Sequence, residues 1–124
     1  MSHLLVVYGT LMKGELHHVS IAHARFVGAA ETTPDYELVQ IDYYPALLAG
    51  GTQRVVGELY EVDDLTLKLL DELEEAPGYY KRTLITLSDG RDALTYVMPR
   101  ERAKKSAPIP SGYFRMRTAP PKSK

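Results

Sequence analysis

The amino-acid sequence predicts an α+β domain in which a small, strongly bent or closed sheet has short helices packed outside it. Three observations support this prediction. Many short β-prone runs follow one another, two segments have helical character, and the connections between them are mostly turns. With 124 residues, the chain has the length of one domain and is long enough to bury a hydrophobic core. The sequence alone does not fix whether the sheet closes.

The first half of the chain contains most of the expected strands. A β-prone run at residues 4–8 stops at Gly9 and is typical of a buried first strand. A loop bounded by Gly9 and Gly14 follows, and after it a modest helical stretch at residues 15–25. An aromatic loop with a rigid proline is expected at residues 43–47. Further strands are expected at residues 26–33, 36–41 and 54–62.

The clearest helix follows Val62. Asp63 or Asp64 can accept hydrogen bonds from the N–H groups of its first turn. The pair Pro77-Gly78 is expected to end it, because proline cannot continue a helix. The leucines expected to form its apolar face are Leu65, Leu67, Leu69, Leu70 and Leu73.

A hairpin and a tail complete the chain. Residues 79–87 and 92–98 are expected to pair as strands around an Asp89-Gly90 turn. We therefore expect a folded domain at residues 1–115, followed by a basic, proline-containing and flexible tail at residues 116–124. Near the end, Gly112-Tyr113-Phe114 has the bulk to dock on the body of the protein.

Composition and charge exclude several classes of function. The chain has 15 Lys and Arg, 16 Asp and Glu and a net charge of −1, so we expect no nucleic-acid partner. It has no Cys, which excludes disulfides, zinc sites built on Cys, iron–sulfur clusters and thiol nucleophiles. The apolar run at residues 3–8 is far shorter than the ~20 residues that span a bilayer. We therefore expect no membrane partner and a cytoplasmic location.

The spacing of the residues does not support three common kinds of site. Gly9 and Gly14 have the separation found in a phosphate-binding loop, but Glu15 and Leu16 follow where Lys and Ser or Thr are needed. The histidines within residues 17–23 lack the i, i+4 spacing that brings two imidazoles to one metal, so we interpret them as surface or partly packed residues. No serine lies in a Gly-x-Ser-x-Gly motif.

Two neighbouring glutamates near the end of the predicted helix are not equivalent. At about 100° per residue, Glu74 falls among the leucines of the apolar face, whereas Glu75 falls on the polar side. A carboxylate at an apolar boundary is partly desolvated, so its pKa rises toward the range of a useful general base. On periodicity alone, an alternative stays open in which the helix frays before Pro77 and Glu74 extends into water.

The loop after the first strand has the composition of an anion-binding site. Gly9 has no Cβ atom, so the backbone there can approach a ligand closely. If a helix begins near Glu15, free N–H groups around Thr10 and Leu11 can form a concavity that suits a carboxylate. A plain strand-to-helix turn is the alternative interpretation.

Several short segments occur in an order typical of one known family. They are Val7-Tyr8-Gly9-Thr10-Leu11, Tyr44-Pro45-Ala46, Gly57-Glu58-Leu59-Tyr60-Glu61-Val62, Leu70-Asp71-x-x-Glu74-x-x-Pro77, Tyr80-x-Arg82-Thr83, Tyr96-Val97 and Ser111-Gly112. Together these segments resemble the γ-glutamylcyclotransferase-like family, which includes γ-glutamylamine cyclotransferases and plant AIG2-like proteins. The chain departs from many members in having no Asn, whereas they carry one soon after the first loop.

The resemblance implies a small mixed β-barrel with helices packed outside and a cavity that holds a γ-glutamyl group. It implies a catalytic glutamate that matches Glu74, three residues before Pro77, and not Glu75. The loop residues that would hold the substrate are Tyr8, Gly9, Thr10 and Leu11. The tyrosines that could line the cavity, or only pack around it, are Tyr43, Tyr44, Tyr113 and our substrate-binding candidate, Tyr80.

The implied activity is release of 5-oxoproline from a γ-glutamyl amine or γ-glutamyl-amino acid. The α-amine of such a substrate attacks its own γ-carbonyl, so the enzyme mainly orients the substrate and moves protons. Glu74 would act as the general acid/base. No metal or organic cofactor is implied. The alternative is a non-catalytic binding module that keeps the same pocket for a small carboxylated ligand.

Overall fold

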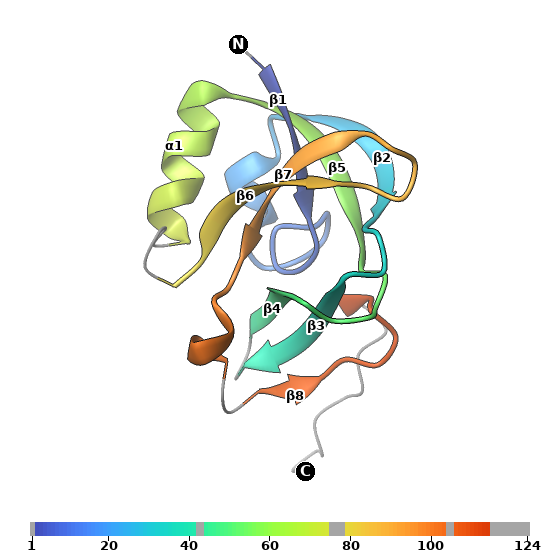
Figure 1. Ribbon diagram of the computed structural model, residues 1–124. Helices are drawn as coiled ribbons and strands as arrows, with labels where there is room; N and C mark the ends of the chain where they lie inside the picture. The colour runs from blue at the N-terminus through green and yellow to red at the C-terminus, as the bar shows by residue number, and fades with distance from the viewer. Residues whose placement is uncertain (1, 42–43, 75–78, 104–105, 115–124) are drawn as a thin grey trace.

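Two sheets and one α-helix form the fold of the computed structural model, which describes residues 2–41, 44–74, 79–103 and 106–114. The larger sheet has the strand order β2–β5–β1–β7–β6 and the smaller one the order β4–β3–β8. Figure 1 shows the smaller sheet below the larger one and helix α1 beside β6. The elements are β1 (Ser2–Val7), the 3₁₀ helix η1 (His18–Ile21), β2 (Arg25–Glu31), β3 (Tyr36–Ile41), β4 (Tyr44–Ala49), β5 (Val56–Asp63), α1 (Asp64–Leu73), β6 (Lys81–Thr86), β7 (Asp92–Val97), the 3₁₀ helix η2 (Arg100–Arg102) and β8 (Ala107–Pro108).

Strand β1 lies in the middle of the larger sheet. It pairs antiparallel with β5 along its whole length and parallel with β7 at Leu5. Its last residues, from Leu5 onward, are buried on both faces, as expected for a central strand between two packed layers. The predicted buried first strand is therefore confirmed, and it carries the chain into the interior of the molecule.

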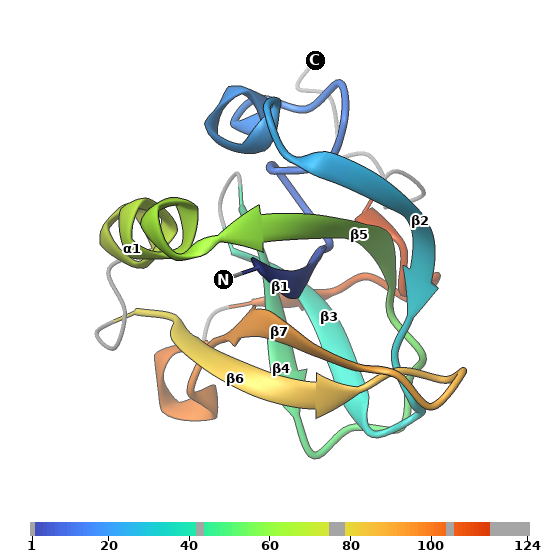
Figure 2. The ribbon, with the colours of Figure 1, turned by 90° about the horizontal axis from the view of Figure 1, so that it is seen from above.

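The α+β class is confirmed, but the closed barrel is not. Within the described residues, the edge strands β2 and β6 do not form a ladder with each other, so the larger sheet is open. A single bridge between Thr32 and Leu87 joins the chain just beyond these two strands. Hydrogen bonds also connect the two sheets, because Met98 N–H donates to the Leu47 carbonyl over 2.9 Å. Figure 2 shows the strands of both sheets curving around a shared interior.

The predicted helix at residues 15–25 is wrong in extent, because only His18–Ile21 is helical and forms a 3₁₀ turn. The backbone there makes hydrogen bonds of the i to i−3 kind, such as His18 N–H to the Glu15 carbonyl. His17 N–H instead donates to the Thr10 carbonyl over 2.7 Å, so the chain folds back on the preceding loop. Tertiary contacts thus replace the α-helical ladder.

The predicted aromatic loop at residues 43–47 is also wrong, because Tyr44–Ala49 forms strand β4 and pairs with β3. Pro45 has no N–H group to donate to a ladder and is therefore confined to strand edges. The order β4–β3–β8 makes β4 an edge strand, where this proline is tolerated. Residues 42 and 43 lie outside the described residues.

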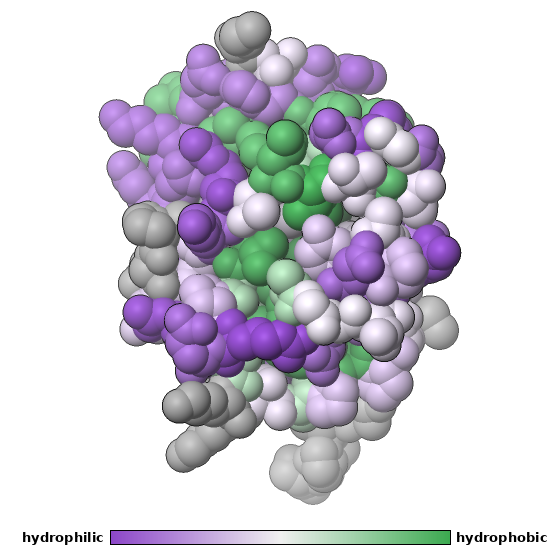
Figure 3. All heavy atoms as spheres, in the orientation of Figure 1, coloured by the Kyte–Doolittle hydropathy of each residue, from purple (hydrophilic) through white to green (hydrophobic). Residues whose placement is uncertain are grey.

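Helix α1 begins as predicted but buries fewer leucines than predicted. The Asp63 side chain caps it by accepting a 2.8 Å hydrogen bond from Thr66 N–H. Of the five leucines, Leu67 and Leu70 are buried, because the helix contacts the sheet along a narrow stripe. The others, Leu65, Leu69 and Leu73, are 65%, 57% and 42% exposed. Figure 3 shows that apolar residues reach the surface on the face viewed in Figure 1. The predicted stop at Pro77-Gly78 lies outside the described residues.

The predicted hairpin is confirmed, since β6 and β7 pair antiparallel around the Asp89-Gly90 turn. Phe114 is 3% exposed and packs in the main core, so the end of the described chain docks on the body as expected. The proposed tail at residues 116–124 lies outside the described residues, and the domain boundary stays a prediction. None of the helices in the described ranges has the length and apolar content needed to cross a membrane.

Candidate active site

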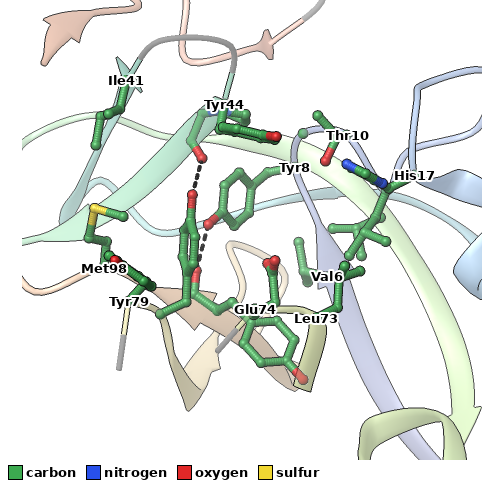
Figure 4. A pocket seen from close by; sticks show the side chains of 16 residues that line it. Val6, Tyr8, Thr10, His17, Ile41, Tyr44, Leu73, Glu74, Tyr79 and Met98 are labelled. Carbon is green, nitrogen blue, oxygen red and sulfur yellow. Dashed lines mark hydrogen bonds between the residues drawn. The ribbon is translucent and has the colours of Figure 1, made fainter. Parts of the chain in front are cut away.

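A cavity of about 410 Å³ opens where β1, β4, α1 and β7 meet. All six residues that the sequence singled out for substrate binding or catalysis line it: Tyr8, Gly9, Thr10, Leu11, Glu74 and Tyr80. These residues come from the loop after β1, the end of α1 and the segment before β6, which lie far apart in the chain. Figure 4 shows several of them pointing toward one another around the cavity.

Glu74 lies at the C-terminal cap of α1. Its N–H group donates to the Leu70 carbonyl over 2.8 Å, which holds its backbone against the last helical turn. Its side chain points into the cavity (Figure 4), and burial raises the pKa of the Glu74 carboxyl to about 7. This agrees with the predicted desolvated position and not with the alternative in which Glu74 extends into water. Glu75 lies outside the described residues.

The carbonyl groups of the loop that follows β1 accept hydrogen bonds from within the protein. The Gly9 carbonyl accepts from Met12 N–H over 3.0 Å, and the Thr10 carbonyl accepts from His17 N–H over 2.7 Å. His18 Nδ1 lies 2.9 Å from the Leu11 carbonyl and donates to it, because a carbonyl can only accept.

The N–H groups of the same loop are left for another partner. In a trans peptide the N–H points opposite to the carbonyl of the same unit. The N–H groups of Thr10 and Leu11 therefore point away from the donors that hold the carbonyls. Among the described residues, neither of these two N–H groups has a hydrogen-bond acceptor. Neighbouring N–H groups without a protein acceptor are able to bind an anion.

Three tyrosine hydroxyls are fixed around the cavity. Tyr8 donates to the Tyr96 carbonyl over 2.6 Å, and Tyr80 donates to the Pro45 carbonyl over 2.9 Å. Tyr96 donates to Asp71 Oδ1 over 2.7 Å. Burial raises the pKa of all three hydroxyls, and the Glu74 charge adds to the effect, so they are protonated donors at neutral pH.

Sequence reasoning missed one wall of the cavity. His17 lines it and stacks on Tyr44, with ring centroids 6.4 Å apart and planes 15° apart. The interpretation of His17 as an ordinary surface or packed histidine gave no reason to place it there. Tyr44 and Pro45 belong to one of the segments that resemble the family, so the sequence contained a signal for their place in the cavity. Tyr113, which the sequence suggested as a possible lining residue, does not line it. Further lining residues without a sequence signal are Ile41, Leu73, Tyr79 and Met98.

The described residues do not gather into a metal site. No group of three or more His, Asp or Glu side chains that could hold a metal ion is found in the part of the chain that the structure describes. The expectation that the chemistry needs no cofactor stays a prediction. The groups that face the cavity can accept and donate a proton and can bind an anion through backbone N–H groups.

The sequence is similar to those of known proteins. The sequence matches the family described as "Gamma-glutamyl cyclotransferase, AIG2-like" over residues 5–116. The chain belongs to this family. Its named members are γ-glutamylcyclotransferase-like enzymes, so the resemblance drawn from the loop and glutamate segments is confirmed.

Individual family members show the extent of the similarity. Gamma-glutamylaminecyclotransferase A of Danio rerio is 40% identical over 105 residues, which cover 73% of this chain and 65% of the relative. Gamma-glutamylaminecyclotransferase of Bos taurus is 44% identical over 86 residues, which cover 62% of this chain and 51% of the relative. The chain thus spans between half and two thirds of the length of these two relatives.

The fold is shared with a solved family member. The crystal structure of an AIG2-like protein from Mus musculus is 32% identical and superposes with a TM-score of 0.71, covering 78% of this chain and 77% of that one. The similarity of fold therefore extends over most of the two chains.

Proposed function

We propose that this protein releases 5-oxoproline from a γ-glutamyl amine or γ-glutamyl-amino acid, with Glu74 as the general acid/base. The observation that carries the proposal is the position of Glu74. Its carboxyl has a pKa raised to about 7, and Glu74 lines the same cavity as Thr10 and Leu11. A general base works best when its pKa lies near the working pH. The cavity volume of about 410 Å³ suits a small molecule.

The reaction begins with removal of a proton from the substrate. The α-ammonium group is not a nucleophile while it is protonated, so the ionised Glu74 carboxylate accepts one of its protons. The free amine then attacks the γ-carbonyl carbon and forms a carbon–nitrogen bond that closes the five-membered ring. Because nucleophile and electrophile belong to one molecule, binding in the right conformation supplies much of the rate enhancement.

The second half of the reaction breaks the original amide. The protonated Glu74 gives its proton to the leaving nitrogen, the bond between that nitrogen and the γ-carbon breaks, and the electron pair returns to the nitrogen. The attacking nitrogen loses a further proton to water, so the products are 5-oxoproline and a free amine. One group thus serves as base and then as acid.

The loop after β1 would supply hydrogen-bond donors to the substrate, whereas Glu74 supplies the carboxylate. The N–H groups of Thr10 and Leu11 would bind either the α-carboxylate of the substrate or the oxyanion that develops on the γ-carbonyl oxygen. Both groups are negative, and both suit donors that are already oriented by the fixed carbonyls of the loop.

The decisive experiment measures 5-oxoproline released from a panel of γ-glutamyl amines, γ-glutamyl dipeptides and glutathione. We expect product from at least one of them, a loss of about 100-fold or more for Glu74→Gln, and near-wild-type activity for Glu75→Gln. Release of 5-oxoproline by Glu74→Gln at close to the wild-type rate, or loss of activity in Glu75→Gln alone, would overturn the assignment of Glu74. Ligand binding without any product would instead support the non-catalytic binding module.

A further inference from the structure

Asp71 lies one helical turn before Glu74 and binds two strands at once. Its Oδ1 accepts the 2.7 Å hydrogen bond from the Tyr96 hydroxyl on β7. Its Oδ2 lies 3.2 Å from a guanidinium nitrogen of Arg82 on β6. The Asp71 side chain is 31% exposed and that of Arg82 is 35% exposed, so this ion pair is only partly screened by water. Asp71 therefore ties the last turn of α1 to the β6–β7 hairpin.

The contact continues through Tyr96 to the opposite side of the cavity. The Tyr96 carbonyl accepts the Tyr8 hydroxyl over 2.6 Å, and the Tyr8 hydroxyl accepts from Leu47 N–H over 3.3 Å. Tyr8 begins the loop that carries the free backbone N–H groups. A continuous set of contacts thus runs from Asp71 through Tyr96 to Tyr8, joining the helix that carries Glu74 to the loop that faces it.

We propose that Asp71 is a positioning residue that holds Glu74 at a fixed place opposite the Tyr8 loop. The inference rests on the proposed function, in which Glu74 exchanges protons with the substrate. Helix ends are loose unless something holds them, and Glu74 is the capping residue of α1. A misplacement of about 1 Å in a reacting group can cost about 100-fold in rate. Asp71 prevents this by fixing the turn from which Glu74 projects.

The pKa of the Glu74 carboxyl depends on the groups around it, so a change in this pKa shows whether Asp71 holds the helix end in place. The titratable groups on the cavity wall are Tyr8, His17, Tyr44, Tyr79, Tyr80 and Tyr96, and the charged groups on the neighbouring turn and strand are Asp71 and Arg82. Burial is the cause of the raised Glu74 pKa. Loosening the turn exposes the carboxyl to water, so its pKa falls toward the ordinary value for glutamate.

Two substitutions at one position separate the hydrogen bond from the charge. Asp71→Asn and Asp71→Ala both remove the negative charge that faces Arg82. The asparagine keeps an amide oxygen that accepts from the Tyr96 hydroxyl, whereas alanine keeps no acceptor. A difference between the two variants that disappears when Tyr96→Phe is added reports the contact with Tyr96. Glu72→Gln is the matched control, because Glu72 is the exposed neighbour of Asp71 on the same turn.

Kinetics give the first measurement. For Asp71→Ala we expect kcat for 5-oxoproline release to fall by about 10- to 100-fold, with KM changed by less than about 3-fold. Asp71→Asn should recover at least about 5-fold in kcat, and adding Tyr96→Phe to Asp71→Asn should remove that recovery. Glu72→Gln should match the wild type. Equal kcat values for Asp71→Ala and Asp71→Asn, in protein shown to be folded by thermal unfolding, would overturn the proposal.

A second measurement needs no turnover. The carboxyl carbon of Glu74 is followed by NMR against pH in the wild type and in both Asp71 variants. We expect the midpoint to fall further in Asp71→Ala than in Asp71→Asn, and coincident midpoints for the two variants would refute the positioning role. If the wild type releases no 5-oxoproline, the proposed function fails, while this titration still tests whether Asp71 holds Glu74.

Discussion

The ring of Pro45 occupies the space that a Cβ atom on Gly9 would need. The first loop of the cavity and strand β4 are therefore in direct contact, with no room for a side chain between them. This contact explains why a glycine follows Tyr8. Because Tyr44 precedes Pro45 in β4, the same contact also fixes how far the loop lies from the Tyr44 ring.

Gly9→Ala is expected to displace Pro45 or the loop and to lower kcat/KM by about 10-fold or more. Overpacking at this buried position should also cost about 1–3 kcal/mol of unfolding free energy. Gly90→Ala is the control, because Gly90 has a φ of +91° in the β6–β7 turn and open space around it. That variant should lose stability but keep its kinetics. Normal kinetics in Gly9→Ala would show that the loop adapts to the larger side chain.

Local signals in the sequence were sufficient for part of the site. The helical period indicates the apolar side of α1 for Glu74, and the family-like segment favours this position over a frayed helix end. The Tyr8–Leu11 loop was identified through its glycine and its family-like motif. These features depend on residues adjacent in the chain, so no knowledge of the tertiary fold was needed.

The remaining features depend on contacts between distant segments. His17 reaches the cavity because its N–H group binds the Thr10 carbonyl, which pulls residues 15–25 out of a regular helix. Pro45 lies in a strand because β3 supplies a partner on one side only. The exposure of Leu69 follows from how little of α1 the sheet covers. Propensity and periodicity do not contain this information.

The pH dependence of the reaction should report the Glu74 carboxyl. Because a base must be ionised, kcat/KM should fall about tenfold per pH unit below a midpoint of about 7. The measurement is the rate of 5-oxoproline release between pH 5 and pH 9 at low substrate concentration. A midpoint near the ordinary glutamate value would show that Glu74 is solvated in the free enzyme and contradict the desolvated site.

Glu74→Gln should stabilise the protein at high pH. A raised carboxyl pKa means that the folded state binds this proton more tightly than the unfolded state, so stability falls as pH rises from about 4.5 to about 7. Above this window the ionised, partly desolvated carboxylate costs stability that glutamine does not. We expect a gain of about 1–2 kcal/mol at pH 8 and none at pH 4, measured by urea unfolding. Glu72→Gln, which changes an exposed side chain on the same turn, is the matched control.

Two tyrosine substitutions should differ in cost although each removes one hydroxyl. Tyr8→Phe leaves the Tyr96 carbonyl and Leu47 N–H, both buried backbone groups, without the hydroxyl that serves them. Tyr80→Phe removes only the donor to the Pro45 carbonyl, in a half-buried place that water can reach.

We therefore expect Tyr8→Phe to cost about 2–3 kcal/mol of unfolding free energy and Tyr80→Phe about 1 kcal/mol. Urea unfolding at pH 7 measures both, and an unchanged dependence on urea concentration shows that the unfolded states are comparable. Equal costs would mean that water from the cavity reaches the Tyr8 partners, because a hydrated backbone group loses little when its protein partner is removed.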